Sequence, residues 1–535
     1  MTAIALGVGV ALRAWYAFHW PITADESIVG LMSRQILQGH FSAFYWGQVY
    51  GGAEPYPVAV LAAITRSTVW ALKLTPILLS AGAAVLTWRI ARRLVPDARL
   101  AALAGALVWA APQSAVVNST VEMGFRGVTL VCGLGLVLVA LRLFDGRRSW
   151  RAFGGLGLLA GVGWWSSPEI VYFAVPAVVL VGVAIHGDPE LGHLRRWGTR
   201  LALTVVAAVV GALPWLWANV VSGWHSLTIG AFQVPPDAPG YSGRLRLFFE
   251  YMLPMLFSLR AQQTGDWLVR RGVCLVLLAL LSLALLGALV LSWLRDGRSR
   301  ALAIGVIAFP FLMALSPATW FWGDGRYADL AVPLIVLVLV VGCAEVAGRL
   351  WHGRRGQSRK VSARRLAMAT LGLVMVALTV ANFAGYVAPG DSFFTGWTNP
   401  DAPTDRAIAD LEADGVTAGY ADYWVAYRLD LLGDGRLQIT TAGSDVNRWS
   451  ALNTVVDDAR SPAWLFVTPA GQGPQQFGAT VYIQGPDGLS QTAFVADLNR
   501  LGIGYRLVDA GLVRAVIPDR RVTPRQIFSF GSVES

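Results

Sequence analysis

The chain has 535 residues, of which 55% are hydrophobic and only 14% are charged. This composition excludes a soluble globular protein of that length and indicates a polytopic α-helical membrane protein. The basic residues behind the net charge of +10 lie mainly in short loops between apolar runs. Such placement reports membrane topology and forms no basic face, so we expect no nucleic-acid partner.

Apolar runs of roughly the length that crosses a bilayer, about 17 to 25 residues, recur through the first two thirds of the chain. They lie at 3–19, 69–90, 99–115, 124–144, 153–167, 169–186, 200–218, 271–294, 301–318, 328–348 and 366–387. These runs predict about eleven transmembrane helices. The tight turn at 166–169 leaves a second interpretation open, a kinked or re-entrant element at SSPEIVYF, because proline removes a backbone hydrogen bond.

Clusters of arginine occupy every second loop between these runs. They include Arg89 to Arg99, Arg147 to Arg151, Arg195 to Arg200, Arg295 to Arg300 and Arg349 to Arg365. Because basic loops stay on the cytoplasmic side, we expect a protein of the cytoplasmic membrane whose alternate loops face outward. The outward segments are then 20–68, about 114–123, 166–169, about 219–270, about 316–327 and everything after about 388.

The composition changes near Pro389 to a mixture of polar and apolar residues. Helical patterns at TDRAIADLEADG and SQTAFVADLNRLG alternate with strand patterns at VTAGYA, RLQITTA, AWLFVTP and YRLVDA. We therefore divide the chain into a transmembrane catalytic module, 1–388, and a small extracytoplasmic α/β domain, 389–535. No P-loop, GxGxxG or GxSxG motif occurs in the second part, so a scaffold or acceptor-binding role fits it better than chemistry.

The outward segment 20–68 holds three acids, the adjacent pair Asp25 and Glu26 and, about thirty residues later, Glu54. Acids beside apolar segments are costly to desolvate, so the cluster indicates a site. Two structural readings stay open. Thr23 or Asp25 could cap a helix that begins at TADES, and Glu54, in the rigid loop GGAEPYP, could be a surface acid.

This segment resembles the first outer loop of the GT-C glycosyltransferases in the family 39 and protein O-mannosyltransferase superfamily, in particular its bacterial branch. The residues that carry the resemblance are Asp25, Glu26, Trp46, Gly47, Gln48, Tyr50, Gly51 and Glu54. Gly325, Arg326 and Tyr327 match a weaker second element, and YADYWVAYRL at 420–429 a third. The resemblance implies transfer of a sugar, usually with inversion, from a polyprenyl-phosphate carrier to an acceptor at the outer face.

The resemblance implies that Asp25 is the catalytic base that takes the proton of the acceptor hydroxyl. Glu26 would orient the acceptor or a divalent cation, Mg²⁺ or Mn²⁺, although no further ligand at fixed spacing supports a metal site and none is assigned. Arg326 would bind the lipid phosphate through its bidentate donors. An ion pair with Asp324 is the alternative.

The remaining substrate-binding candidates are Glu54, Trp46, Gln48, Tyr50, Tyr327 and Glu169. Trp46 and Tyr50 could stack on a sugar ring, or lie at the membrane interface as such residues commonly do. Glu122 and Arg126, four residues apart, predict an ion pair on one helix face. We expect membrane lipid and a glycan, lipid or protein acceptor as partners.

A transporter or flippase of lipid-linked sugars is the alternative function. Transporters place ionisable residues and broken helices near the middle of the membrane, often in repeated halves. Here the acids gather at outward ends of helices, and no internal repeat is visible. The enzyme is therefore favoured over the transporter and over a glycan-binding protein without activity.

Overall fold

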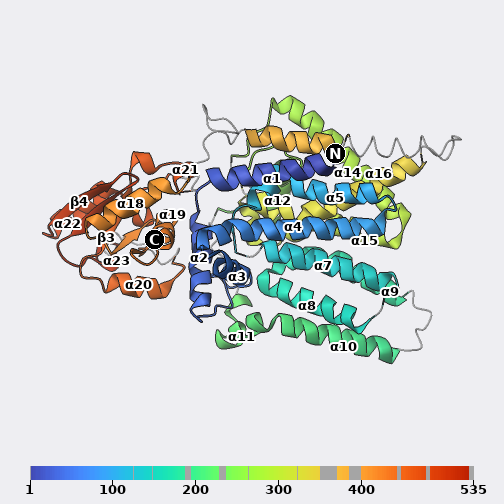
Figure 1. The fold of residues 1–535 in the computed structure, drawn as a ribbon, viewed down its shortest axis with the longest axis horizontal. Coiled ribbons are helices and arrows are strands. Elements are labelled where there is room, and N and C mark those ends of the chain that lie inside the picture. The colour runs from blue at the N-terminus through green and yellow to red at the C-terminus, as the bar shows by residue number, and fades with distance from the viewer. Residues whose placement is uncertain are drawn as a thin grey trace.

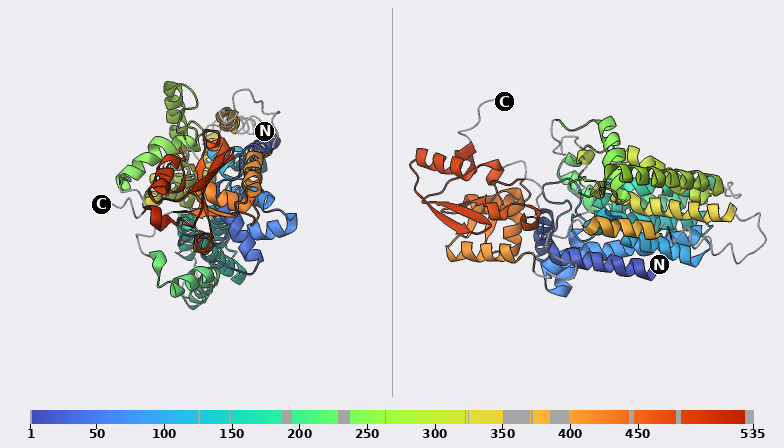
Figure 2. Two further views of the ribbon diagram at one scale, coloured as in Figure 1. Left: turned by 90° about the vertical axis from the view of Figure 1, so that its left-hand side faces the viewer. Right: turned by 90° about the horizontal axis from the view of Figure 1, so that it is seen from above.

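The computed structural model has two parts, a bundle of long helices and a smaller sheet-bearing part at one end of it (Figures 1 and 2). It describes residues 2–124, 126–147, 149–186, 194–227, 237–262, 264–321, 323, 325–349, 370, 372–384, 399–442, 447–477 and 482–528. Helix α2, Ala24–Leu37, runs across the end of the bundle, between the two parts.

A helix lies at each of the eleven apolar runs. These helices are α1 (Thr2–His19), α4 (Thr68–Leu94), α5 (Ala98–Ala110), α7 (Arg126–Phe144), α8 (Trp150–Ser166), α9 (Val171–His186), α10 (Leu194–Gly211) with α11 (Leu213–Val221), α14 (Arg271–Arg295), α15 (Gly297–Met313), α16 (Val332–Arg349) and Gly372–Phe383. Within the described residues, five helices are long and apolar enough to span a membrane, or six if a bent pair counts as one. Helical membrane-type architecture is thus present, while the number eleven stays a prediction.

Shorter helices fill the end of the bundle nearest the sheet. They are α3 (Pro55–Thr65), α6 (Gln113–Asn118), α12 (Tyr241–Leu247) and α13 (Leu253–Leu256), with a π-helical turn at Phe248–Met252 and short 3-10 turns at Pro168–Ile170, His225–Leu227, Pro317–Trp320, Gly325–Tyr327 and Asp329–Ala331. The 3-10 turn at Pro168–Ile170 joins α8 to α9 as a tight turn. Short elements of this kind leave space between them, and both cavities described below lie there.

The single helix expected at 200–218 is wrong. The segment breaks at Ala212, and its halves, Trp197–Gly211 and Leu213–Val221, are bent by 61°. Pro214 explains the break, because proline has no backbone N–H and is favoured in the first turn of a new helix.

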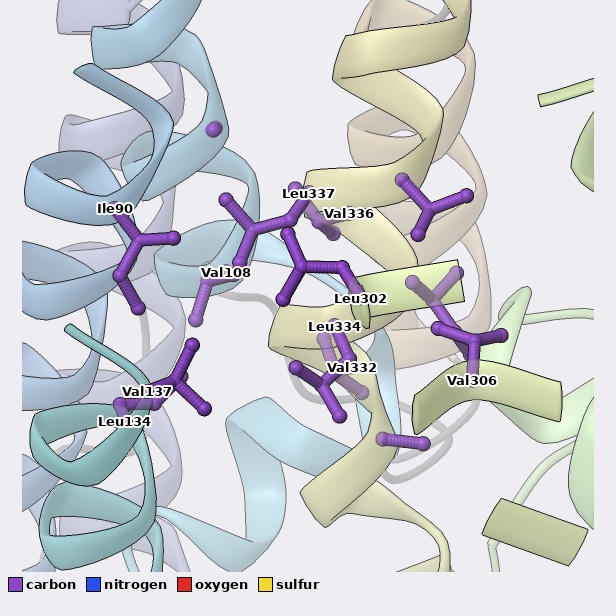
Figure 3. Packing of buried hydrophobic residues seen from close by; sticks show 14 of the residues in the cluster. Ile90, Val108, Leu134, Val137, Leu302, Val306, Val332, Leu334, Val336 and Leu337 are labelled. Carbon is purple, nitrogen blue, oxygen red and sulfur yellow. The ribbon is translucent and has the colours of Figure 1, made fainter. Parts of the chain in front are cut away.

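The bundle core packs two groups of helices against each other. Ile90, Val108, Leu134 and Val137 come from α4, α5 and α7, and face residues of α15 and α16 (Figure 3). The facing set is Leu302, Val306, Val332, Leu334, Val336 and Leu337. Branched aliphatic side chains dominate because long apolar helices in this core have few polar groups to satisfy.

Helices α8 and α10 approach closely through glycines. A Cβ at Gly157 would lie 2.0 Å from the carbonyl oxygen of Thr204, and one at Gly161 would lie 2.1 Å from that of Ala208. Small residues of this kind let helix backbones meet, which is a common way to pack helices within membranes. The contact fixes the distance between α8 and α10.

The described residues of the sheet-bearing part form five strands, β1 (Ala418–Ala421), β2 (Gln438–Thr441), β3 (Ala463–Val467), β4 (Tyr505–Ala510) and β5 (Val513–Pro518), in the order β2-β1-β3-β5-β4. Strand β1 pairs in parallel with β2 and β3, and β5 pairs antiparallel with β3 and β4. The helices around it are α18 (Ala402–Ala413), α19 (Tyr423–Leu432), α20 (Ser450–Asp457), α21 (Pro474–Phe477), α22 (Gln491–Arg500) and α23 (Pro524–Phe528), with 3-10 turns at Pro469–Gly471 and Pro486–Gly488.

Four of these strands lie at the predicted patterns, and β5 was not predicted. Gly511, with a φ of +69°, sits in the short turn between β4 and β5. A glycine in a tight connection between two apolar runs is a hairpin signal that could have identified β5.

Helix α19 packs directly on α2. Ile28, Val29 and Met32 of α2 form one buried cluster with Tyr427 and Leu431 of α19. Gly30 lies under Leu431, whose side chain would be 2.8 Å from a Cβ at that position. This contact brings the first and last thirds of the chain together.

Candidate active site

Asp25 lies in the first turn of α2, where the two parts meet. Thr23 begins the helix as its N-cap, and the side chain of Asp25 points to partners from both parts. Its Oδ1 accepts a hydrogen bond of 2.6 Å from the hydroxyl of Tyr423, and its Oδ2 lies 3.4 Å from Nη1 of Arg326. The carboxylate is thus held between a phenol and a guanidinium.

The surroundings of Asp25 keep it ionised. Burial raises the pKa of this carboxyl, but Arg326, the hydrogen bond from Tyr423 and the charge of Arg448 lower it more, so the net pKa lies below the ordinary value. The side chain keeps 29% of its surface exposed. It is therefore an accessible carboxylate at neutral pH, as a base must be.

Glu26 does not share this site, which corrects its predicted part in orienting the acceptor or a cation. Its side chain is fully buried. One oxygen accepts from the backbone N–H of Thr23 at 2.9 Å, which with Thr23 completes a capping box, and the other lies 2.9 Å from Nζ of Lys73. Adjacent residues of a helix point about 100° apart, so Glu26 faces the interior where Asp25 faces the site.

Arg326 lies in the 3-10 turn Gly325–Tyr327 and lines a cavity of about 700 Å³. Its Nη1 also lies 3.4 Å from the sulfur of Met123. Asp324, the alternative partner, lies outside the described residues. Asp25 and Arg326, which are 301 positions apart, are therefore brought together as the resemblance implies.

Glu54 also lines this cavity and is 2% exposed. Its Oε2 accepts from the backbone N–H of Val128 at 3.1 Å, and its carboxyl hydrogen-bonds to the buried Glu122. Burial raises the pKa of Glu54 to about 7 and that of Glu122 well above its ordinary value, with the neighbouring charge of Glu54 adding to the latter. Both shifts favour protonated carboxyls in this buried pair, and Glu54 is no surface acid.

A second, larger cavity of about 1240 Å³ adjoins the first, and Arg126 lines both. Tyr50, Tyr327 and Glu169 line the second cavity together with Trp164 and Trp215. Burial raises the pKa of Tyr50 to about 12, so its hydroxyl stays a neutral donor. Three predicted substrate-binding residues thus converge on one cavity.

The ion pair of Arg126 corrects the prediction of a pair with Glu122. Its Nη2 lies 3.3 Å from Oε1 of Glu169, and its guanidinium lies 4.6 Å from the ring centre of Tyr327. Glu122 instead turns toward Glu54 and accepts from the backbone N–H of Gly124. The chain bends at Gly124, where φ is +91°, so the helical spacing assumed between 122 and 126 does not exist.

Trp46 and Gln48 lie at the boundary between the parts and line neither cavity. The ring of Trp46 stacks on that of Trp449, with centroids 4.7 Å apart, so one face of the ring is covered and its stacking on a sugar stays a prediction. The amide oxygen of Gln48 faces the guanidinium of Arg448, and Nη1 of Arg448 donates to the carbonyl of Gly47 at 3.1 Å. The loop 41–52 thus anchors the sheet-bearing part.

Glycines give that loop its shape. Gly47 and Gly51 have φ values of +65° and +83°, and a Cβ at Gly52 would lie 2.0 Å from the carbonyl oxygen of Ala43. No other residue type fits these positions without strain. The aromatic and glycine pattern of the loop is therefore a folding requirement as well as a motif.

Sequence reasoning missed two residues near Asp25. Tyr423 and Arg448 belong to the part to which no chemistry was assigned, although Tyr423 lies within the YADYWVAYRL motif. In the described part of the chain, no group of three or more His, Cys, Asp or Glu could hold a metal ion. The carboxylate of Glu26, where the cation was predicted, already pairs with Lys73 and accepts a hydrogen bond in the capping box.

Part of the chain is similar in sequence to a known family. Residues 54–217 match the family model described as dolichyl-phosphate-mannose-protein mannosyltransferase. None of the curated proteins compared matches the chain in sequence.

Solved structures match it along nearly the whole length. ArnT from Cupriavidus metallidurans in the apo state is 13% identical, with 96% of this chain and 97% of that chain covered and a TM-score of 0.61. ArnT bound to undecaprenyl phosphate is 16% identical, with 96% of each chain covered and a TM-score of 0.55.

An oligosaccharyltransferase from Archaeoglobus fulgidus in the apo form is 13% identical. It matches over 86% of this chain and 69% of that chain, with a TM-score of 0.50. Likeness at these identities shows the fold. The chain therefore has the GT-C fold of these transferases, and residues 54–217 match the model of the dolichyl-phosphate-mannose-protein mannosyltransferase family.

Proposed function

We propose that the chain is a membrane glycosyltransferase that moves a sugar from a polyprenyl-phosphate donor to an acceptor hydroxyl. The observation that carries the proposal is the contact of Asp25 with Arg326 at a cavity lined by Arg126 and Glu54. An accessible carboxylate next to cations is what displacement of a phosphate by a hydroxyl requires. The ArnT structure with undecaprenyl phosphate supports the donor class, because its fold covers nearly the whole chain.

In the proposed reaction, the acceptor oxygen forms a bond to the anomeric carbon as the bond from that carbon to the phosphate oxygen breaks. The acceptor proton passes to Asp25, and the electron pair of the broken bond leaves with the polyprenyl phosphate. Attack opposite the leaving group inverts the anomeric carbon. Arg326, which faces Asp25 in this structure, would turn toward the departing phosphate and neutralise its charge.

The second cavity supplies the rest of the substrate site. We propose that Tyr50, Tyr327 and Glu169 contact the sugar or the first isoprene units there, since aromatic rings and one ion pair give both apolar and polar surface. Arg126 lies between the cavities and would contact the donor phosphate from the other side. Glu54, which lines the first cavity, would contact the substrate there.

The arginine pattern supports a placement in the cytoplasmic membrane, with the Asp25 segment and the sheet-bearing part outside. We propose eleven spans on this basis, the shorter apolar helices included. The acceptor would then be a glycan, lipid or protein of the cell envelope. The divalent cation, Mg²⁺ or Mn²⁺, stays a prediction that transfer with and without EDTA tests.

One observation favours the transporter alternative, the broken span at Ala212. Transporters use the exposed backbone at such breaks to bind ions or substrates. Here the residues around the break, Gly211 to Leu216, carry no charge, and the acids of the site lie elsewhere. The break is thus better explained by Pro214.

The test is release of polyprenyl phosphate from a panel of polyprenyl-phosphate sugars by purified protein in nanodiscs. We expect Asp25→Asn to lower release by at least about a hundredfold, because the base is lost while the size of the side chain is kept. Asp434→Asn is the matched control, since this exposed acid lies at the same boundary, 3.2 Å from Arg34. Full turnover in Asp25→Asn would exclude Asp25 as the base.

A further inference from the structure

The sheet-bearing part reaches the candidate base through a tyrosine. Helix α19 begins at Tyr423 because Asp422 caps it, accepting from the backbone N–H of Trp424 at 2.9 Å. In this first turn the Tyr423 hydroxyl points at Asp25 and donates to Oδ1 at 2.6 Å. The two residues are 398 positions apart in sequence.

The remaining contacts of Asp25 fix the orientation of its carboxylate. Tyr45 donates its hydroxyl to the backbone carbonyl of Asp25 at 3.2 Å, which holds the start of α2. Oδ2 faces Arg326 at the longer distance of 3.4 Å. One oxygen is therefore tightly engaged by a neutral donor, while the other faces the group that lines the first cavity.

The side chain of Tyr423 is itself held in place by Arg448. Arg448 hydrogen-bonds to the Tyr423 side chain, and its guanidinium lies 5.8 Å from the ring centre. Arg448 in turn donates to the carbonyl of Gly47 in the loop of the first part. The phenol thus accepts from a cation and donates to the carboxylate, and such a chain of hydrogen bonds strengthens each member.

We propose that Tyr423 is a positioning residue for Asp25: it fixes Oδ1, so that Oδ2 is the oxygen that receives the proton of the acceptor. The inference rests on the proposed function and extends it, because it makes the sheet-bearing part a component of the active site. A carboxylate fixed at one oxygen cannot rotate its second oxygen away from the acceptor. Such preorganisation contributes to rate without contact with the substrate.

Attachment of the two parts does not require the Tyr423 hydroxyl. The buried ion pair of Arg428 with Asp401 lies at the boundary, and Asp401 accepts from the backbone N–H of Ile22 at 3.1 Å. Arg34 donates to the carbonyl of Leu431 at 3.0 Å. With these contacts in place, Tyr423→Phe should keep the assembly and remove only the hydroxyl.

The charged and titratable groups that face Asp25 are Arg326, Tyr423, Arg448 and Tyr45. Loss of the Tyr423 hydroxyl removes a donor that favours the ionised carboxylate, and so raises the pKa of Asp25. We therefore expect Tyr423→Phe to move the acid limb of the kcat profile upward by about one pH unit. At neutral pH, kcat should fall by about tenfold, with the KM of the donor unchanged.

The matched control is Tyr420→Phe. Tyr420 lies three residues earlier, and its hydroxyl hydrogen-bonds to Asp457 within the sheet-bearing part, away from Asp25. This variant should keep the wild-type kcat and acid limb. A wild-type kcat and acid limb in Tyr423→Phe would overturn the inference, and so would an equal change in both variants.

A second readout separates this inference from the proposed function. Infrared difference spectra of protein with isotope-labelled aspartate, with Asp25→Asn for assignment, follow the ionisation of Asp25 without any substrate. An upward shift of this titration in Tyr423→Phe, with no sugar transfer by the wild type, would support the contact and refute the transferase. An unchanged titration would overturn the contact even if the wild type transfers sugar.

Discussion

Two adjacent acids at the start of α2 have opposite surroundings. Asp25 is partly exposed between Tyr423 and Arg326, whereas Glu26 is enclosed with Lys73. The sequence shows a pair of equivalent carboxylates, but a helix turns them about 100° apart, and long-range partners then give each its function. Of the two, Asp25 alone has the access that chemistry requires.

We expect Glu26→Gln to destabilise the protein while leaving the turnover of folded molecules near wild type. The substitution leaves the buried ammonium of Lys73 without its counter-charge, and breaking a buried pair in this way costs about 3–5 kcal/mol. Thermal unfolding in detergent measures the loss, and Glu26→Gln combined with Lys73→Met should restore most of it. If Glu26→Gln instead folds like wild type and no longer transfers sugar, Glu26 belongs to the chemistry.

The pair Glu54 and Glu122 makes stability depend on pH. Because the folded-state pKa of Glu54 is raised to about 7 from 4.5, its contribution to folding is full below pH 4.5 and is lost as pH rises through about 7. The loss is on the order of 3 kcal/mol. We expect Glu54→Gln to lessen the fall in Tm between pH 5 and pH 8, because the side chain no longer ionises.

The control for this prediction is Glu250→Gln. Glu250 is exposed and pairs with Arg246 at 3.0 Å, so its removal should leave the pH dependence of the Tm unchanged. A Glu54→Gln protein with the wild-type pH dependence would mean that the pKa of Glu54 is not raised in the folded state.

Helix α8 contains glycines in two different environments, one packed against a neighbouring helix and one with free space beside it. Gly161 lies against the backbone of α10, whereas a Cβ at Gly155, about one and a half turns earlier, would have no neighbouring atom within 4 Å. The contact at Gly161 fixes the spacing of α8 and α10, and in the continuation α11 the ring of Trp215 packs edge-on against Trp164 in the wall of the second cavity. The shape of that cavity therefore depends on the packing of α8 against α10, less than one helical turn from Trp164.

We expect Gly161→Ala to lower the stability by about 1–3 kcal/mol, because the added methyl group overlaps the carbonyl of Ala208. Donor affinity should fall with it, since α11 shifts with α10. Gly155→Ala should be neutral or stabilising by up to about 1 kcal/mol. Thermal unfolding and titration with a polyprenyl phosphate check both variants, and equal behaviour of the two would refute the close contact.

The elements also show what a local pattern can and cannot predict. Apolar runs located the bundle helices because their length and composition are local properties. The break at Ala212 was missed although Pro214 signals it. Length and apolar composition define a run, and neither property registers a proline within it. Strand β5 was missed although the turn at Gly511 signals a hairpin, whereas its pairing with β3 is a non-local property that no local pattern shows.

At the scale of the whole molecule, the site forms where distant segments meet. Asp25 and Arg326 could be identified from the sequence by motif. Tyr423 lies in the third matched stretch, but no local pattern shows that it contacts Asp25, and Arg448 lies in no matched motif. The stacking of Trp449 on one face of Trp46 could not be predicted either, and sugar binding by Trp46 stays a prediction.

Because α19 packs on α2, the parts of the site are made in a fixed order during translation. A ribosome that adds about 5–20 residues per second needs roughly 20 to 80 seconds to travel the 398 positions from Asp25 to Tyr423. During that interval the apolar face of α2, with Ile28, Val29 and Met32, has no cover from α19. A nascent chain thus carries Asp25 before it carries Tyr423, which orients that carboxylate. Only a molecule translated through α19 has a complete site.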